Sequence, residues 1–191
     1  MTDYDSVKGQ FLIATPELQD PNFRGRVVFI CDHNEQGAFG LIINHKASIK
    51  KFPKIRGLEG NEWIFNQDLY FGGPVHTDHI LILYRGQNTI TYDKWIADNI
   101  ALVTSLSELY QLSGTELNSD NVRLYLGCAG WTENQLESEI ESGVWKIVSS
   151  DTDMIFSNHP RYVWKENLMK LGGRYKIIAQ MPDEEDILGS N

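Results

Sequence analysis

The sequence is poor in cysteine, and this excludes several classes of protein. Cys31 and Cys128 are its two cysteines in 191 residues. They cannot build a disulfide framework, and neither has a second cysteine at metal-ligand spacing, so a reducing compartment is expected. The N-terminal residues MTDYDSVK are polar, and no run approaches the roughly 20 apolar residues that cross a bilayer. We expect a cytoplasmic protein without a membrane partner.

Positive charge is also scarce. The chain has 17 basic and 26 acidic residues, and its formal net charge is -9. Its basic residues are scattered, with one enriched stretch at 46–56. Because an acidic surface repels phosphate backbones, no nucleic-acid partner is expected. The hydrophobic and charged fractions, 41% and 23%, are typical of globular proteins. We predict one domain over residues 1–191, with flexible ends at 1–8 and 181–191.

The motifs of common metal and nucleotide sites are missing. The sequence has no H-E-x-x-H, no paired C-x-x-C, no P-loop and no G-x-G-x-x-G. His76 and His79 stand three apart where a turn enters a strand, so they are not expected to share a face. Cys31, Asp32 and His33 are consecutive strand residues that point alternately to opposite faces. The sequence predicts neither a metal site nor a cofactor.

Cys128 lies between an apolar run and an expected helix start, where free backbone N–H groups can stabilise a thiolate. A nucleophile elbow needs glycines two positions before and two after the nucleophile, and these positions hold Leu126 and Gly130. Free cysteine is more often a small buried hydrophobe than a nucleophile. We therefore interpret Cys128 as a residue that fills a turn, and we assign no catalytic residue.

Hairpin-like strands are expected early in the chain and helices late. Apolar runs predict strands at 9–15, 26–33, 37–44, 69–73, 79–86, 100–104, 121–127 and 144–150. The polar turn between the second and third of these predicts a hairpin. Because strands and helices do not alternate regularly, the sequence predicts an α+β fold with a largely antiparallel or mixed sheet.

Three helices are expected. Capping boxes at Ser105–Glu108 and Thr132–Gln135 predict one helix from Ser105 and a second just after Trp131. A third covers 160–171, with a proline in its first turn and a glycine as its stop. The second helix is expected to divide into an inward side, Leu136 and Ile140, and a solvent side, Glu133, Glu137 and Glu141.

Several long motifs occur in a specific order. They are FLIATPELQDPNFRGRVVFICDHNEQGAFGLIIN at 11–44, FGGPV at 71–75, LGCAGWTENQLESEI at 126–140 and LGG at 171–173. Together they resemble the AlgH/YqgE family of bacterial proteins, which have no assigned biochemical function. The resemblance spans about residues 10–172 and implies a bifurcated sheet curled into a pseudo-barrel and flanked by short helices. It also implies a transcriptional-regulator label, although the sequence shows no helix-turn-helix signature.

The chain departs from the family pattern at three places. Relatives carry Tyr at the position of Cys128, Lys or Arg followed by Pro at His45-Lys46, and often His at Tyr84. A nucleophile common to the family therefore cannot lie at position 128.

Some residues that match the family motifs have no evident packing role. These candidate ligand- or partner-binding residues are His33, Asn44, Gly72, Gly73, Trp131 and Gln135. Asn44 ends an apolar strand, where a side-chain amide either caps a turn or contacts a ligand. Gly72-Gly73 either forms a structural turn or offers backbone N–H groups to an anion.

Three functions remain open at this point. The favoured one is a non-enzymatic cytoplasmic module that binds a protein or a small molecule through a groove near Asn44, Gly73 and Trp131. The second is a hydrolase-like enzyme of unrecognised type that uses His33 with a nearby carboxylate. The third is a transcriptional regulator. The sequence leaves the partner and the oligomeric state open.

Overall fold

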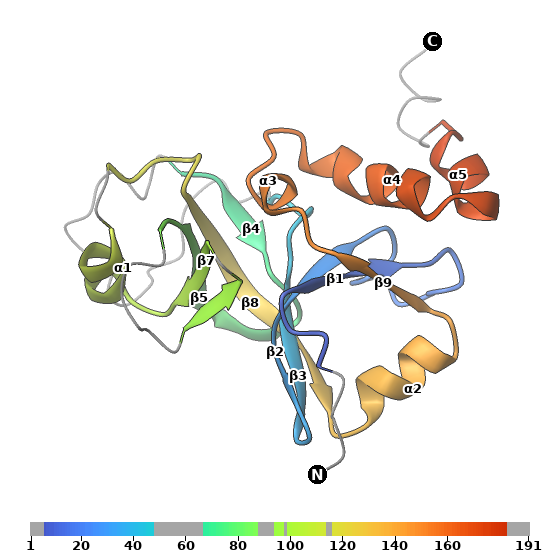
Figure 1. The fold of residues 1–191 in the computed structure, drawn as a ribbon, viewed down its shortest axis with the longest axis horizontal. Coiled ribbons are helices and arrows are strands. Elements are labelled where there is room, and N and C mark those ends of the chain that lie inside the picture. Colours follow the sequence, from blue (N-terminus) through green and yellow to red (C-terminus); the bar gives the residue numbers. More distant parts are fainter. Residues whose placement is uncertain (1–5, 48–66, 88–93, 98, 114–115, 183–191) are drawn as a thin grey trace.

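Figure 1 shows the fold in a computed structural model. The structure describes residues 6–47, 67–87, 94–97, 99–113 and 116–182. Residues 1–5 and 183–191 of the predicted flexible ends lie outside the described residues, as does the basic stretch from residue 48 onward. In the described part of the N-terminal end, Val7 is buried and its N–H donates to the ring of His33. This part of the N-terminal end is therefore packed against the body of the protein.

One sheet organises the described chain. Its strands are β1 (Gln10–Ala14), β2 (Val27–Asn34), β3 (Gly37–Ile42), β4 (Leu69–Phe71), β5 (Val75–Arg85), β6 (Trp95–Ala97), β7 (Ile100–Val103), β8 (Val122–Thr132) and β9 (Trp145–Ser149). They lie in the order β6-β7-β5-β8-β3-β2-β1-β9, and β4 pairs with β8 outside this path. Among these strands β4 and β8 are parallel, and the other pairs are antiparallel. The predicted hairpin is β2–β3.

The sheet divides at β8. One edge of β8 pairs with β5 between Val122 and Cys128. The other edge pairs first with β4, over Leu124–Leu126, and then with β3, over Ala129–Thr132. Because β8 belongs to both halves, the halves diverge and curl into an open half-barrel (Figure 1). The α+β class and the bifurcated, largely antiparallel sheet curled into a pseudo-barrel are confirmed.

Short helices flank the sheet. They are α1 (Leu106–Leu112), α2 (Gln135–Glu141), α3 (Thr152–Ile155), α4 (Pro160–Leu171) and α5 (Gly173–Ala179). In α1, Ser105 is the N-cap and accepts from the N–H of Glu108, as its capping box predicts. α4 has the predicted bounds, with Pro160 in its first turn and Gly172 as its C-cap. α2 packs on β8 and β9, while α4 packs on β1 and carries α5 (Figure 1).

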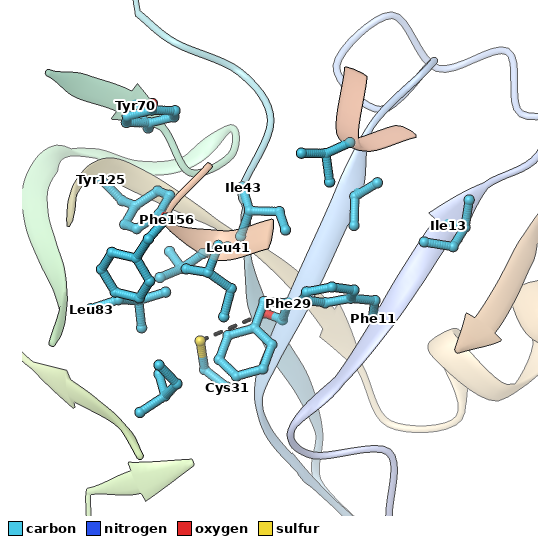
Figure 2. Close-up of a cluster of buried hydrophobic side chains, with 14 of the residues drawn as sticks. Phe11, Ile13, Phe29, Cys31, Leu41, Ile43, Tyr70, Leu83, Tyr125 and Phe156 are labelled. Carbon is cyan, nitrogen blue, oxygen red and sulfur yellow. Dashed lines mark hydrogen bonds between the residues drawn. The ribbon is translucent and has the colours of Figure 1, made fainter. Parts of the chain in front are cut away.

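Buried side chains cover both faces of the sheet. Along β1, Phe11 and Ile13 belong to one apolar cluster while Leu12 and Ala14 belong to another, as strand alternation requires. Figure 2 shows the first cluster, in which Phe11 and Phe29 meet edge to face with ring centroids 5.9 Å apart. This cluster lies under α3 to α5, and the second lies under α2. A third fills the space between α1 and the strands β5, β7 and β8.

β8 is longer than predicted, and the predicted turn at Cys128 is wrong. The strand continues from Val122 to Thr132, so Cys128 lies inside it, opposite Val75 of β5. A two-residue turn then leads into α2, which begins at Gln135 rather than just after Trp131. In that turn Asn134 takes a left-handed conformation with φ 59°. Gly127, next to Cys128, therefore serves a purpose other than a turn.

That purpose is the close approach of two backbones. A Cβ atom on Gly72 would overlap the carbonyl oxygen of Gly127, and one on Gly73 would overlap the backbone of Cys128. Gly73 also has a φ of 151°, which L-residues rarely adopt. The N–H of Gly72 donates to the carbonyl of Leu126, and the carbonyl of Gly72 accepts from Ile42. The segment after β4 is therefore wedged between β8 and β3, where side chains cannot fit.

Replacing Gly72 by Ala is expected to lower the free energy of unfolding by about 1–3 kcal/mol, because the methyl group has no room. Gly130→Ala is the matched control, since its Cβ would meet nothing closer than a Val75 methyl at 3.9 Å. That change should stay within about 0.5 kcal/mol of the parent protein. Urea unfolding of both variants tests this, and equal effects would show that the backbones are not in tight contact.

Candidate functional site

The carboxylate of Glu139 holds helix α2 against the sheet. Oε2 of Glu139 accepts from the indole N–H groups of Trp131 and Trp145, each at 2.8 Å. The two indoles meet edge to face with centroids 6.0 Å apart, and Phe23 stacks on Trp131. Trp131 is buried in this aromatic group, so it has a packing role. Glu139 lies in the 126–140 motif but is not one of the candidate residues, and it accepts the indole N–H of Trp131.

Gln135 belongs to the same network. Its side-chain oxygen accepts from the N–H of Thr132 at 3.1 Å and from the hydroxyl of Thr132 at 3.2 Å. Its side-chain N–H donates to Oε1 of Glu139 at 2.9 Å. The predicted contact between Thr132 and Gln135 is therefore present, although it joins a strand end to a helix start. Gln135 is exposed, but its amide serves the fold.

His33 is buried, and both of its ring nitrogens are bonded. Nδ1 accepts from the N–H of Val7 at 3.0 Å, which places the ring proton on Nε2. Nε2 then donates to Oε1 of Glu137 at 2.9 Å. Glu137, predicted to face water, thus turns partly toward the sheet, while Glu133 and Glu141 are exposed as predicted. The enzyme hypothesis correctly expected a carboxylate beside His33, but a ring whose lone pair is taken by a backbone N–H is poorly placed to accept a substrate proton.

Asn44 is a bridge between backbone segments. Its side-chain oxygen accepts from the N–H of Val27 at 2.9 Å, and its amide group donates to the carbonyl of Gly25 at 2.9 Å. The residue is buried, and its bonds hold the loop before β2 against the end of β3. Asn44 therefore has a structural explanation, as do Gly72 and Gly73, which are wedged between β8 and β3. Of the alternatives that the sequence left open, the geometry favours a capping role for Asn44 and a structural turn for Gly72-Gly73.

The six predicted site residues fall into two groups rather than one groove. His33, Trp131 and Gln135 gather around α2, through Glu137 and Glu139. Asn44, Gly72 and Gly73 lie at the other end of β3, where Ile42 bonds to Gly72. Each group is occupied with holding the fold together. A partner-binding surface must therefore be sought elsewhere, or beside these residues.

Two basic residues lie beside Asn44. His45 follows it in the sequence, Arg26 precedes Val27, to which the Asn44 side chain is bonded, and both are half-buried. Nε of Arg26 and Nδ1 of His45 are shielded from solvent and have no hydrogen-bond partner among the described residues. Burial, and secondarily the charge of Arg26, hold the pKa of His45 below its usual value of 6.5. The site therefore keeps His45 neutral beside a permanent cation.

The two cysteines are inert in this environment. Cys31 is buried, and its thiol lies 3.6 Å from the carbonyl oxygen of Phe29 (Figure 2). Burial raises the pKa of both the Cys31 and the Cys128 thiols, which disfavours the reactive thiolate. The geometry gives no support to a cysteine nucleophile.

Two arginines fasten the segment between α3 and α4 to the sheet. The guanidinium of Arg85 lies 4.5 Å from the ring centre of Phe156, and that of Arg123 lies 5.7 Å from it. Arg123 is buried and donates to the Tyr70 hydroxyl at 2.9 Å and to the Ser157 carbonyl at 3.0 Å. Such contacts between cations and aromatic rings strengthen when they are desolvated. α4 is therefore carried on a rigid support.

His76 and His79 do meet, contrary to the expectation from sequence. Their ring centroids are 5.8 Å apart. The reason is an irregularity of β5 between Val75 and Ile80, in which His76 takes a left-handed φ of 52°. A regular strand would have separated the two rings.

The surface that stands out is the outer side of α4 and α5. α4 turns Val163, Asn167 and Leu168 inward, which leaves Tyr162 and Met169, two turns apart, on the opposite side. Lys165, between them, donates to the carbonyl of Met181 at 2.8 Å, so the chain after α5 reaches the same side. We call the outer side of α4 with Tyr162, Lys165 and Met169, taken together with the exposed Ile177 of α5 and Met181 after it, the α4–α5 face.

The α4–α5 face holds most of the exposed apolar side chains of the described residues. Six large apolar side chains are exposed among the described residues, and four of the six belong to this face: Tyr162 (40%), Met169 (41%), Ile177 (61%) and Met181 (55%). The sequence held a signal for it, because Tyr162 and Met169 lie opposite the apolar stripe of Trp164, Leu168 and Leu171 in helix 160–171. An exposed apolar face carries no motif, so no motif marks it.

Among the described residues no group of three or more His, Cys, Asp or Glu side chains is arranged to hold a metal ion. No helix in the same residues is long and apolar enough to cross a membrane.

Comparisons with known proteins agree on one family. The AlgH-like family model matches residues 11–176. The chain is 34% identical over 183 residues to a UPF0301 protein of Cytophaga hutchinsonii, which covers 92% of this chain and 95% of the relative. It is 35% identical over 159 residues to a UPF0301 protein of Chromohalobacter salexigens, which covers 81% and 85%.

Two solved structures share the fold. The solution structure of the AlgH protein from Pseudomonas aeruginosa matches with a TM-score of 0.69 and 28% identity, over 96% of this chain and 98% of that one. The crystal structure of protein DIP2367 from Corynebacterium diphtheriae matches with a TM-score of 0.73 and 20% identity, over 95% of each chain. The second likeness concerns the fold alone.

Replacing Glu139 by Ala is expected to lower the free energy of unfolding by about 3 kcal/mol, because two largely buried indole N–H groups lose their acceptor. The indole N–H resonances of Trp131 and Trp145 should shift together in the NMR spectrum. Glu141→Ala on the same helix is the control and should change stability by no more than about 0.5 kcal/mol. Unmoved indole signals in the Glu139 variant would contradict the network.

The depressed pKa of His45 predicts a pH dependence of stability. The unfolded chain takes up this proton near pH 6.5, whereas the folded chain takes it up only at lower pH. The free energy of unfolding should therefore fall as the pH drops below about 6.5. His45→Gln should lessen that fall, and His159→Gln, at an exposed histidine, should leave it unchanged. Urea unfolding at pH 7.5 and 5.5 tests this, and identical pH dependence in all three proteins would refute it.

Proposed function

The chain belongs to the AlgH-like family, and we propose that it is a non-enzymatic cytoplasmic module that binds an acidic protein partner through its α4–α5 face. The cytoplasmic location is supported by two cysteines that are both free and buried. The observation that carries the binding role is the gathering of four exposed apolar side chains on one helical hairpin.

Exposed apolar residues that occur singly need no explanation, but a group of them on one face is a mark of an interaction surface. Here the group is centred on the outer side of α4, directly opposite its buried side. Two of its members are methionines, whose flexible thioethers adapt to different partners. The face therefore offers an apolar centre to another molecule.

The charge around this centre favours an acidic partner. Helices α4 and α5 carry five basic residues, Arg161, Lys165, Lys170, Arg174 and Lys176, and one acidic residue, Glu166, in a chain whose net charge is -9. Lys170 pairs with Asp151 at 3.6 Å and Arg174 with Glu17 at 3.0 Å, both at exposed positions where such pairs are weak. An excess of basic residues on the helices that carry an apolar centre steers acidic partners toward it.

A protein partner explains this face better than a nucleic acid or a membrane. Phosphate backbones are bound by cationic and polar groups, and the centre of this face is apolar. Anionic membranes would be repelled by the rest of the chain, since the net charge is -9. The basic helices favour the transcriptional-regulator alternative, which therefore enters the test.

The test begins with the partner that copurifies from the native host, identified, remade and titrated against the protein. Met169→Asp and Ile177→Asp should each weaken binding at least about tenfold, as loss of a central apolar contact does. Tyr110→Asp adds the same charge at an exposed aromatic residue of α1 and should leave affinity within about twofold. Circular dichroism and thermal unfolding confirm that each variant is folded.

Three outcomes would reject the proposal. The first is a partner whose affinity is unchanged in both α4–α5 variants. The second is a Tyr110→Asp variant that loses as much affinity for the partner as the Met169→Asp and Ile177→Asp variants do. The third is retention on duplex DNA at low salt that is lost when Lys165 and Lys176 are reversed to Glu, since this result would establish nucleic-acid binding instead.

A further inference from the structure

We propose that His76 and His79 form a surface site for a divalent transition-metal ion of the zinc, nickel and copper class. Both residues lie in the exposed first half of β5, whose residues 75–79 are all solvent-exposed. The site is separate from the α4–α5 face, and nothing in the proposed function depends on it.

The backbone irregularity of β5 creates the site. β5 pairs with β8 at Val75, opposite Cys128, and pairs again at Ile80, opposite Leu126. Between these two pairs β5 advances five positions while β8 advances two. His76 turns back with a φ of 52°, a conformation that side chains with a Cβ atom rarely adopt. As a result the two imidazoles meet, with centroids 5.8 Å apart and planes at 75°. Two rings at this separation can bind one ion between them after small side-chain rotations.

Asp78 prepares one of the two ligands. Nδ1 of His79 lies 2.8 Å from Oδ1 of Asp78, and a carboxylate can only accept, so Nδ1 carries the proton. Nε2 of His79 then presents its lone pair, in the tautomer that binds a metal. A carboxylate behind a metal-binding histidine is a recurrent arrangement that orients the ring and raises its basicity.

The donor set selects the ion. Imidazole nitrogens suit zinc, nickel and copper, whereas calcium and magnesium require several oxygen ligands. Two imidazole rings meet here, and the described residues contain no group of three or more His, Cys, Asp or Glu that could hold a metal ion. The ion would keep open positions filled by water or by a donor from another molecule. The site is therefore built for reversible binding rather than for a permanent structural ion.

The test is calorimetric titration of the full, untagged chain with ZnCl2, accompanied by NMR spectra of the histidine rings. One ion should bind, and the signals of His76 and His79 should shift first. His76→Gln and His79→Gln should each weaken binding at least tenfold. Asp78→Asn should weaken it severalfold by removing the charged acceptor. CaCl2 and MgCl2 at the same concentration should give no binding.

His159→Gln is the matched control, because it removes an exposed histidine from elsewhere in the chain. Its zinc affinity should equal that of the parent protein. Zinc binding that survives both His76→Gln and His79→Gln would overturn the proposal, as would loss of binding in the His159 variant. Amide NMR spectra of each variant without metal establish that the fold is intact, so that a lost site is distinguished from a lost structure.

Discussion

The wedge of Gly72-Gly73 against Gly127-Cys128 is the contact on which the architecture depends. It lets the segment after β4 enter between β8 and β3, so that β8 can serve both halves of the sheet. A side chain at Gly72 would force these backbones apart. Because the halves diverge from β8, each faces its own layer, with α1 on one half and α4 with α5 on the other (Figure 1). Close backbone approach at a few glycines thus sets where the outer helices lie.

Polar residues that resemble a functional site are largely used to fasten the elements to this sheet. Glu139 holds two indoles, Glu137 holds His33, and Asn44 bridges two backbone segments. Buried polar groups need such partners, so a motif rich in them is compatible with a purely structural role. The apolar α4–α5 face has no comparable role within the described chain. That contrast moves the functional hypothesis from the motifs to a surface that they leave unexplained.

Sequence patterns predicted the elements that obey local rules. The β2–β3 hairpin and α4 follow from apolar periodicity, a polar turn and a proline start, and the fold class follows from their order. The failures arose where distant segments decide. The glycines around Cys128 indicated a turn, because the contact of Gly127 with Gly72-Gly73 is not visible in the sequence. Strand alternation predicted that His76 and His79 lie apart, because it does not account for the irregularity of β5. The helical pattern predicted that Glu137 faces water, because its partner, His33, lies 104 positions away in the sequence.

Site-specific crosslinking inside the native host tests most directly which surface is functional. The alternatives are the α4–α5 face and the surface at α2 that carries Gln135 and Glu139. A photoreactive amino acid would be placed at Ile177 in one protein and at Gln135 in another, both exposed positions. We predict a covalent adduct with one acidic protein from Ile177 and none with that protein from Gln135. The reverse pattern, or equal adducts at both positions, would contradict the assignment of function to α4–α5.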